Sequence, residues 1–193
     1  MKDALLYKIT RPIITVLFKL FFTPKIIGKE YIPKSGKVIL AGNHTSNFDC
    51  LLLISSTKRN IHFLAKKELW NGPKKIIFAN MGLISVDRKN KDHQALSSSI
   101  AYLENNLLIG IFPEGTTEKE GKMLDFKIGA VKMAKDTNSP IVPFIITGNY
   151  KLFSKNLRIE FLKPIMINGD LNQENINLRN IIEKERGKHI EHI

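Results

Sequence analysis

Beyond Pro24, short apolar runs rich in β-branched residues alternate with longer stretches in which apolar positions recur every three or four residues. Runs of the first kind predict strands, and stretches of the second kind predict helices. The expected strands lie near residues 37–42, 61–65, 83–87, 107–112, 141–147 and 157–167. The expected helices lie near residues 47–57, 67–80, 92–105, 127–137 and 175–190. This alternation is typical of a sheet covered by helices, so it predicts an α/β fold.

The connection between the last two expected strands is short. It runs from Gly148 to Asn156 and leaves no room for a crossover helix, so these two strands should pair antiparallel. No internal repeat, linker or low-complexity stretch interrupts the chain after Pro24. We therefore expect residues 25–193 to form a single domain with a mixed, mostly parallel sheet flanked by helices.

Residues 5–22 follow a different pattern. At about 100° per residue the polar positions fall in one narrow stripe, and apolar positions cover the opposite side of a helix. The stripe consists of Lys8, Arg11, Thr15 and Lys19, and the apolar face consists of Leu5, Ile9, Ile13, Val16, Leu17 and Leu20. Pro12 fits the first turn of a helix that begins there, or kinks a longer one. The segment is thus predicted to be a basic amphipathic helix.

The apolar side of this helix is too short to cross a bilayer. The stretch Ile13–Phe18 covers roughly 9 Å at about 1.5 Å per residue, against a hydrocarbon core of about 30 Å. A basic amphipathic helix rich in aromatic residues is typical of a segment that lies in the membrane interface. We expect residues 1–24 to form an interfacial anchor. The alternative is a helix that packs on the domain's own core.

The basic residues are concentrated at one end of the chain. Its 193 residues carry a formal net charge of +12, and residues 1–91 alone hold 17 Lys and Arg against 5 Asp and Glu. Such an asymmetry indicates an anionic partner, which composition leaves open among phospholipid headgroups, an acidic carrier protein and nucleic acid. Cys50 is the single cysteine, so an intrachain disulfide is excluded and a reducing, cytoplasmic setting follows. Beside a run of leucines, Cys50 is interpreted as a small buried hydrophobe.

A histidine and an aspartate follow the first expected strand. His44 and Asp49 are five residues apart, which on one continuous helix would separate them by about 140°, so His44 should precede the helix. With Ser46 as N-cap, the chain can fold back until the Asp49 carboxylate accepts a proton from one imidazole nitrogen and leaves the other as a base. Acyl transfer needs such a base when a hydroxyl attacks a thioester. The alternatives are a plain capping box, or a metal site, for which two candidate ligands prove little.

Two further stretches place polar groups after expected strands. The apolar run 107–112 ends in Pro113–Thr117, a turn that puts Glu114 and two hydroxyls at the carboxyl end of the sheet, where ligands of α/β proteins usually bind. The run Gly82–Arg88 ends in a cation that can hold a phosphate. Taken singly, the first stretch is also interpretable as a solvated turn, and the second as a cluster of paired surface charges.

In this order and spacing, the three boxes resemble the glycerolipid acyltransferase family that includes 1-acylglycerol-3-phosphate O-acyltransferases. The resemblance covers roughly residues 31–143. The family's His-x4-Asp, Gly-x-Ile-x-x-Asp-Arg and Phe-Pro-Glu-Gly-Thr motifs match, in turn, His44 with Asp49, Gly82–Arg88 and Phe112–Thr116. Further similarity is found at Ala65–Leu69, Phe126–Ala130 and Val142–Pro143.

The resemblance implies an acyl donor bound as a thioester of coenzyme A or acyl carrier protein, and a lysophospholipid acceptor. The most direct acceptor is 1-acylglycerol-3-phosphate, whose product is phosphatidic acid. His44 is then the general base and Asp49 its orienting partner. The residues implied in substrate binding are Lys66, Arg88, Glu114, Gly115, Thr116 and Lys127. Many relatives with a phosphate-bearing acceptor have Arg after Glu-Gly-Thr, whereas Thr117 stands here, so Arg88 and one of the two lysines would neutralise the phosphate.

We expect no metal and no cofactor other than the thioester co-substrate. The chain has no Gly-x-Ser-x-Gly elbow, so direct transfer is a simpler proposal than a covalent serine intermediate. The expected partners are an anionic membrane surface, the lysophospholipid acceptor, and acyl-CoA or an acidic acyl carrier protein. The expected location is the cytoplasmic face of the cell membrane.

Three alternatives remain. A basic nucleic-acid-binding module explains the charge but not the boxes, so nucleic acid is not expected as a partner. A membrane-surface scaffold could keep the same fold without activity. An acyltransferase could also act on another lysolipid, an option that Thr117 leaves open.

Overall fold

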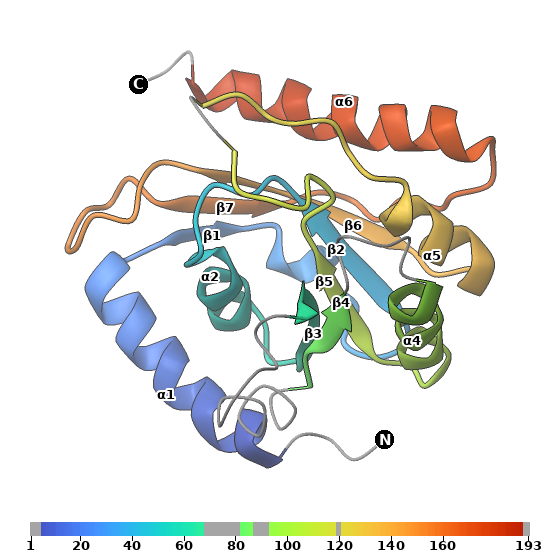
Figure 1. Cartoon of the computed structure of the whole chain (residues 1–193). Helices are drawn as coiled ribbons and strands as arrows, with labels where there is room; N and C mark the ends of the chain where they lie inside the picture. Colours follow the sequence, from blue (N-terminus) through green and yellow to red (C-terminus); the bar gives the residue numbers. More distant parts are fainter. Residues whose placement is uncertain (1–4, 68–81, 87–92, 119–120, 191–193) are drawn as a thin grey trace.

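The computed structural model describes residues 5–67, 82–86, 93–118 and 121–190 (Figure 1). Within these ranges helices and strands alternate along most of the chain. The N-terminal elements are α1 (Leu5–Phe22), β1 (Lys25–Ile27), the 3-10 helix η1 (Lys29–Tyr31), β2 (Val38–Gly42), α2 (Asp49–Ser56), β3 (Ile61–Lys66) and β4 (Ile84–Val86). The remaining ones are α4 (His93–Glu104), β5 (Leu108–Ile111), α5 (Gly129–Thr137), β6 (Ile141–Thr147), β7 (Arg158–Phe161) and α6 (Leu171–Ile190).

The described strands form one sheet in the order β1-β7-β6-β2-β5-β3-β4. From β6 to β4 all neighbouring strands are parallel. β7 is antiparallel to β6 and parallel to β1, so β1 and β7 run against the other strands. The predicted mixed, mostly parallel sheet is therefore confirmed, as is the antiparallel pairing of the last two strands.

Helices cover both faces of the sheet, as Figure 1 shows, with α1 and α2 on one side and α4, α5 and α6 on the other. The side chains of β2 alternate between these two layers. Val38 and Leu40 pack in a core shared with α1 and α2, whereas Ile39 and Ala41 pack in a second core with α4, α5 and α6. All of β2 is buried, because a central parallel strand is covered on both faces. The ends of the central strands are thus held by two cores.

α1 runs from Leu5 to Phe22 with Pro12 inside it, so Pro12 does not begin the helix. Tyr7 and Phe18 are buried in the same core as α2. The exposed apolar side chains of α1 are Ile9, Ile13, Val16, Leu17, Leu20 and Phe21. None of the described helices is long and apolar enough to cross a membrane. One edge of α1 therefore belongs to the core, while its predicted apolar face is open to solvent from Ile9 to Leu20.

Two strand assignments differ from the sequence pattern. No alternation predicts β1, because three residues are too few to show a period, and β1 is defined by its pairing with β7. The strand predicted over 157–167 ends at Phe161. Pro164 has no N–H to donate, and beyond it only an isolated bridge joins Ile165 to Ile141.

The last helix begins at Leu171 and not near 175. The side chain of Asp170 accepts the backbone N–H groups of Asn172 and Gln173 at 3.0 Å each, and so caps the helix at an earlier position. The helix expected over 67–80 lies almost wholly outside the described residues.

Candidate active site

The site residues expected from the sequence follow the carboxyl ends of parallel strands. β5, β2 and β6 are adjacent in the sheet, and they lead into the turn Pro113–Thr117, the segment Asn43–Phe48 and the connection Gly148–Asn156. Adjacent parallel strands end at one edge, so these three segments meet there. The meeting point contains His44, Asp49, Glu114 and Tyr150, which contact one another directly.

The imidazole of His44 is held by the carboxylate of Asp49. Nδ1 of His44 lies 2.8 Å from Oδ2 of Asp49, and Asp49 is 0% exposed. The carboxylate also accepts the backbone N–H groups of Thr45 at 2.7 Å and Ser46 at 2.9 Å, and the hydroxyls of Thr45 at 3.0 Å and Tyr150. A carboxylate surrounded by donors leaves Nδ1 as the donating nitrogen of His44. Within the described part of the chain nothing hydrogen-bonds Nε2, so this nitrogen is the available base.

Asp49 reaches back to His44 because the chain turns tightly between them. Asp49 is the first residue of α2, and the two residues before it form a turn. The Ser46 hydroxyl accepts the N–H of Phe48 at 3.2 Å, while the N–H of Ser46 donates to Asp49. The helix thus starts two residues later than the predicted start at 47, but the predicted fold-back is present. The amino end of α2 adds partial positive charge near the carboxylate.

The segment after β5 positions His44 from the other side. The N–H of His44 donates to Oε1 of Glu114 at 2.8 Å, and the His44 carbonyl accepts the N–H of Glu118 at 2.7 Å. The imidazole stacks on Phe112, with ring centroids 4.1 Å apart and an angle of 15° between the planes. Both the backbone and the ring of His44 are therefore held by residues of the box Phe112–Thr116 and its continuation.

Both carboxylate oxygens of Glu114 receive backbone N–H groups. Oε1 accepts from His44 and Oε2 accepts from Leu124 at 2.7 Å, and Glu114 is only 4% exposed. Burial raises the pKa of the Glu114 carboxyl, while the two N–H groups oppose that shift. These contacts favour a role in positioning His44 over the expected direct contact with the acceptor.

Three other residues expected to bind substrate, Gly115, Thr116 and Lys127, lie at the rim of this edge. Gly115 has a φ of +72°, and a Cβ there would lie 2.8 Å from Nζ of Lys127, so the Lys127 ammonium lies beside the turn. Thr116 and Lys127 are exposed. Lys66 ends β3, but its side chain lies outside what the structure describes, as does the whole of Arg88.

Tyr150 is a contact of the site that no sequence motif indicated. Its hydroxyl donates to Oδ1 of Asp49. Burial raises the pKa of the Tyr150 phenol, and the charge of Asp49 raises it further, so the proton stays on the tyrosine. In the sequence, the one indication of a role for Tyr150 is its position three residues after the strand 141–147. This position brings Tyr150 to Asp49 only because β6 lies next to β2 in the sheet.

Cys50 follows Asp49 in α2 and has a different character. Burial raises the pKa of its thiol to about 12, so the thiol stays protonated at neutral pH. Cys50 is half-buried against the first core, so it packs as a hydrophobe but is less buried than the sequence predicted. In residues 5–67, 82–86, 93–118 and 121–190, no group of three or more His, Cys, Asp and Glu side chains is arranged to hold a metal ion.

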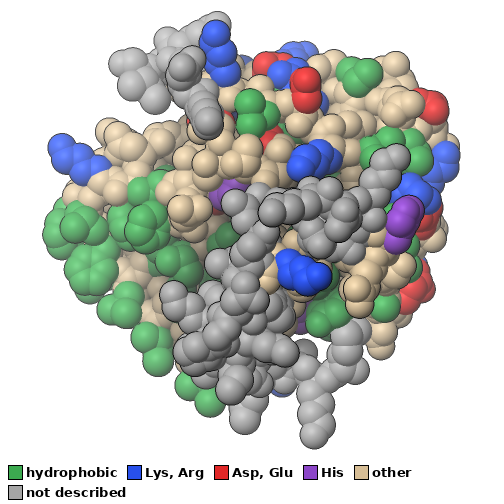
Figure 2. Space-filling view, in the orientation of Figure 1, with side chains coloured by type: hydrophobic (Ala, Val, Ile, Leu, Met, Phe, Trp, Pro, Cys, Tyr) green, Lys and Arg blue, Asp and Glu red, His purple; other side chains and the backbone are tan. Residues whose placement is uncertain are grey.

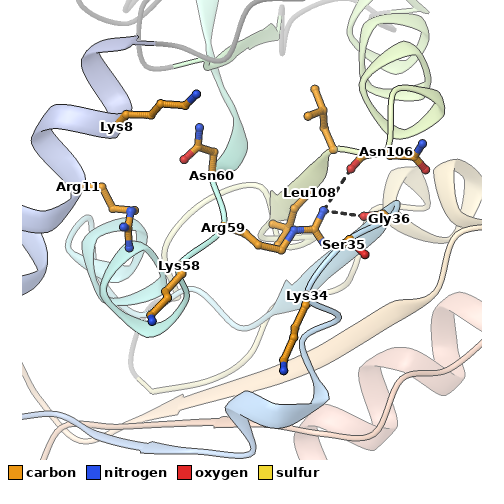
Figure 3. A pocket seen from close by; sticks show the side chains of 11 residues that line it. Lys8, Arg11, Lys34, Ser35, Gly36, Lys58, Arg59, Asn60, Asn106 and Leu108 are labelled. Atoms are coloured by element: carbon orange, nitrogen blue, oxygen red, sulfur yellow. Dashed lines mark hydrogen bonds between the residues drawn. The ribbon is translucent and has the colours of Figure 1, made fainter.

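A basic pocket of about 490 Å³ lies at the opposite end of the sheet (Figure 3). It is bounded by α1 and by the segments that precede β2, β3 and β5. The cations in its wall are Lys8, Arg11, Lys34, Lys58 and Arg59. The length of β2, about 16 Å at roughly 3.3 Å per residue, separates this pocket from the edge that carries His44.

Arg59 joins the segments that form this pocket. Its guanidinium donates to the carbonyls of Pro33 at 2.9 Å, Gly36 at 2.5 Å and Asn106 at 3.2 Å. Partial burial lowers the pKa of Arg59. Because its bonds go to three carbonyls in two separate backbone segments, one before β2 and one before β5, we interpret Arg59 as a structural clamp.

An α/β sheet with a carboxylate-held histidine at the carboxyl edge of its parallel strands is a site for general-base chemistry on a hydroxyl. The chain belongs to the acyltransferase family, which it matches over residues 23–147. This span contains each of the three boxes found in the sequence.

Two named relatives indicate which acyltransferases this chain is similar to. The 1-acyl-sn-glycerol-3-phosphate acyltransferase of Borreliella burgdorferi is 35% identical over 135 residues, covering 68% of this chain and 54% of the relative. The alpha form of that enzyme from Mus musculus is 30% identical over 144 residues, covering 72% of this chain and 50% of the relative. The chain thus spans about half the length of these curated relatives.

A solved structure shares the fold. The crystal structure of the 1-acyl-sn-glycerophosphate acyltransferase PlsC from Thermotoga maritima matches with a TM-score of 0.78 and 22% identity. The match covers 94% of this chain and 78% of the other. Both the layers and the mostly parallel sheet are therefore those of a known acyltransferase fold.

Proposed function

We propose that this chain transfers a fatty acyl group from a thioester donor to the free hydroxyl of a lysophospholipid. The proposed acceptor is 1-acylglycerol-3-phosphate, the product is phosphatidic acid, and the donor is acyl-CoA or acyl carrier protein. The supporting observation is the 2.8 Å contact of His44 Nδ1 with a buried carboxylate, which leaves Nε2 as a base. The relatives named for this acceptor support its choice.

In the proposed reaction, Nε2 of His44 removes the hydroxyl proton as the acceptor oxygen attacks the thioester carbonyl. Asp49 stabilises the resulting imidazolium, and backbone N–H groups at the same edge stabilise the developing oxyanion. Collapse of the tetrahedral intermediate forms the ester and breaks the C–S bond. The leaving thiolate takes the proton back from His44, which restores the base.

The acceptor phosphate needs cations near the base. Lys127 lies beside Gly115 at the same edge, and we assign the phosphate to it together with Lys66 and Arg88. The Thr117 hydroxyl can donate one hydrogen bond but has no charge, so in this proposal the three cations neutralise the acceptor phosphate.

A thioester-release assay tests this proposal. Purified protein would be given one acyl group on CoA and on acyl carrier protein, with lysophosphatidic acid, lysophosphatidylglycerol and lysophosphatidylcholine as acceptors. We expect thiol release that depends on an acceptor and is fastest with the phosphomonoester. His44→Ala should slow release by about 10²–10⁴-fold without unfolding the protein. Equal release by His44→Ala would refute the mechanism, and a preference for another lysolipid would change the assigned acceptor.

We also propose that α1 attaches the protein to the cytoplasmic face of the cell membrane through its exposed apolar face. The face is flanked by basic side chains, which favour anionic headgroups. Ile13→Ser with Val16→Ser should weaken binding to anionic vesicles, because both side chains are exposed and the fold is spared. Ile176→Ser, an exposed apolar position on α6, serves as the matched control. Unchanged vesicle binding by the α1 variant would contradict the anchor.

A further inference from the structure

The connection between β6 and β7, Gly148–Asn156, exposes large apolar side chains. Leu152 is 57% exposed and Phe153 is 68% exposed. Phe153 also has a φ of +57°, a backbone conformation that is costly for a bulky side chain. The two ends of the connection are in close contact, because a Cβ at Gly148 would collide with the carbonyl of Asn156. The chain therefore holds an aromatic side chain in solvent in a defined and unfavourable conformation.

This connection is attached to the end of α1. The N–H of Phe153 donates to the carbonyl of Phe21 at 2.6 Å, and the two rings lie 5.9 Å apart. The Thr23 hydroxyl donates to the carbonyl of Ser154 at 2.9 Å. Figure 2 shows hydrophobic side chains gathered along the left edge of the molecule, where α1 and the tip of the connection lie in Figure 1. The connection thus extends the apolar face of α1.

The charge of this combined surface has one sign. Neither α1 nor the connection Gly148–Asn156 contains an Asp or a Glu. Together they carry five basic residues, of which Lys19, Lys151 and Lys155 are exposed beside the apolar tip. Apolar side chains framed by lysines match the chemistry of an anionic bilayer surface, with apolar chains below and phosphates above.

The same connection reaches the catalytic pair on its inner side. Tyr150 donates to Oδ1 of Asp49, and its ring packs against Phe18 and Phe22 of α1, with centroids 6.2 Å and 5.9 Å away. Phe48, which directly precedes Asp49, lies 5.7 Å from the same ring. One short segment therefore touches α1, the exposed apolar surface and the carboxylate that holds His44.

We propose that Gly148–Asn156 is a second membrane-contacting element, which inserts Leu152 and Phe153 into an anionic bilayer, and that Tyr150 of the same element is a positioning residue for Asp49. The inference rests on the proposed acyl transfer for its catalytic half. The Tyr150 hydroxyl already donates to Asp49 in the isolated chain, and in this proposal that bond keeps the imidazole of His44 in its productive tautomer and orientation.

The membrane half is tested by vesicle co-sedimentation of the full chain. The variant Leu152→Ser with Phe153→Asn removes both apolar side chains, and asparagine tolerates a positive φ, so folding is retained. With vesicles of phosphatidylcholine and phosphatidylglycerol in equal parts, binding should weaken by at least about tenfold. Ile176→Ser, which removes an apolar side chain that is 51% exposed on α6, should bind as the unaltered chain does. Unaltered binding by the double variant, or an equal loss in the control, would overturn this half.

The catalytic half is tested with Tyr150→Phe, which keeps the ring packing and removes only the hydroxyl. We expect kcat to fall by about tenfold, with KM for the acceptor and vesicle binding unchanged. A normal kcat, or a loss of vesicle binding in this variant, would overturn the positioning role. If the unaltered chain released no thiol with any acceptor, the proposed function would fail, while vesicle binding would still decide the membrane half.

Discussion

The two ends of the parallel sheet both collect polar side chains, but they use them differently. At the carboxyl edge, carboxylates and a histidine face one another, the oxygens of Asp49 and Glu114 are occupied by donors, and Nε2 of His44 has no partner among the described residues. At the amino edge, cations surround a pocket, and the Arg59 guanidinium donates hydrogen bonds to three backbone carbonyls.

The difference shows how a polar cluster is recognised as reactive. Asp49 and Phe112 hold the ring of His44, and none of the described residues hydrogen-bonds its remaining nitrogen, which is the arrangement of a base awaiting a proton. Around Arg59 the hydrogen bonds end on backbone carbonyls and connect separate loops. The following variants test that contrast, from the largest expected effect to the smallest.

Asp49→Asn should have the largest effect. The new amide has one acceptor oxygen in place of two and no charge, so it cannot accept from all the present donors and does not stabilise an imidazolium at His44. We expect kcat to fall by about 10²–10⁴-fold, and the free energy of unfolding to fall by about 1–3 kcal/mol. Steady-state rates and urea unfolding measure the two effects, with the exposed neighbour Asn47→Ala as control. A variant with normal kcat would remove the main distinction between the two edges.

Arg59→Met should show the opposite profile at the amino edge. It removes the donors that bind three backbone carbonyls, so the free energy of unfolding should fall by about 2–3 kcal/mol. Thermal or urea unfolding gives this value, and kcat per folded molecule should not change. A loss of kcat at unchanged stability would show that the pocket takes part in the reaction.

Glu114→Gln tests the buried carboxyl through pH. Burial raises the pKa of Glu114 above its ordinary value of 4.5, so the folded chain binds this proton more tightly than the unfolded chain does. The free energy of unfolding should therefore fall as pH rises from that ordinary value through the raised pKa. Glutamine does not titrate, so the difference between the two proteins should change over this window. An unchanging difference would show that the carboxyl titrates alike in both states.

Lys34→Ser with Lys58→Ser should have the smallest effect. Both side chains are exposed in the pocket wall, so stability should stay within about 0.5 kcal/mol and kcat should be unchanged. The same rate assay and urea titration suffice. A clear drop in rate would place substrate at the amino edge and end the division of roles proposed for the two edges.

Much of the architecture was predictable because buried strands are apolar along their whole length. The runs over 37–42, 61–65 and 141–147 agree with β2, β3 and β6 within one residue at each end. β1 escaped prediction because it exists only through its pairing with β7. Asp170 was not predicted to cap a helix, so the predicted start of α6 lies four residues too late.

The candidate site was predictable in its membership more than in its roles. The spacing of His44 and Asp49 allows the predicted fold-back, and the structure contains it. Glu114 was expected to face a substrate, yet its oxygens hold the backbone of His44 and Leu124. Nothing in the order of residues reveals which amide a distant carboxylate will meet.

By itself, the sequence determined the α/β class, the histidine and aspartate fold-back, and the amphipathic character of α1. These follow from local periodicity and from contacts between residues a few positions apart. Only the tertiary structure decided that β6 lies beside β2, which brings Tyr150 to Asp49 although the two residues are 101 positions apart in the chain. Periodicity reports which face of a strand is buried, whereas the neighbour of a strand is chosen by the packing of the whole sheet.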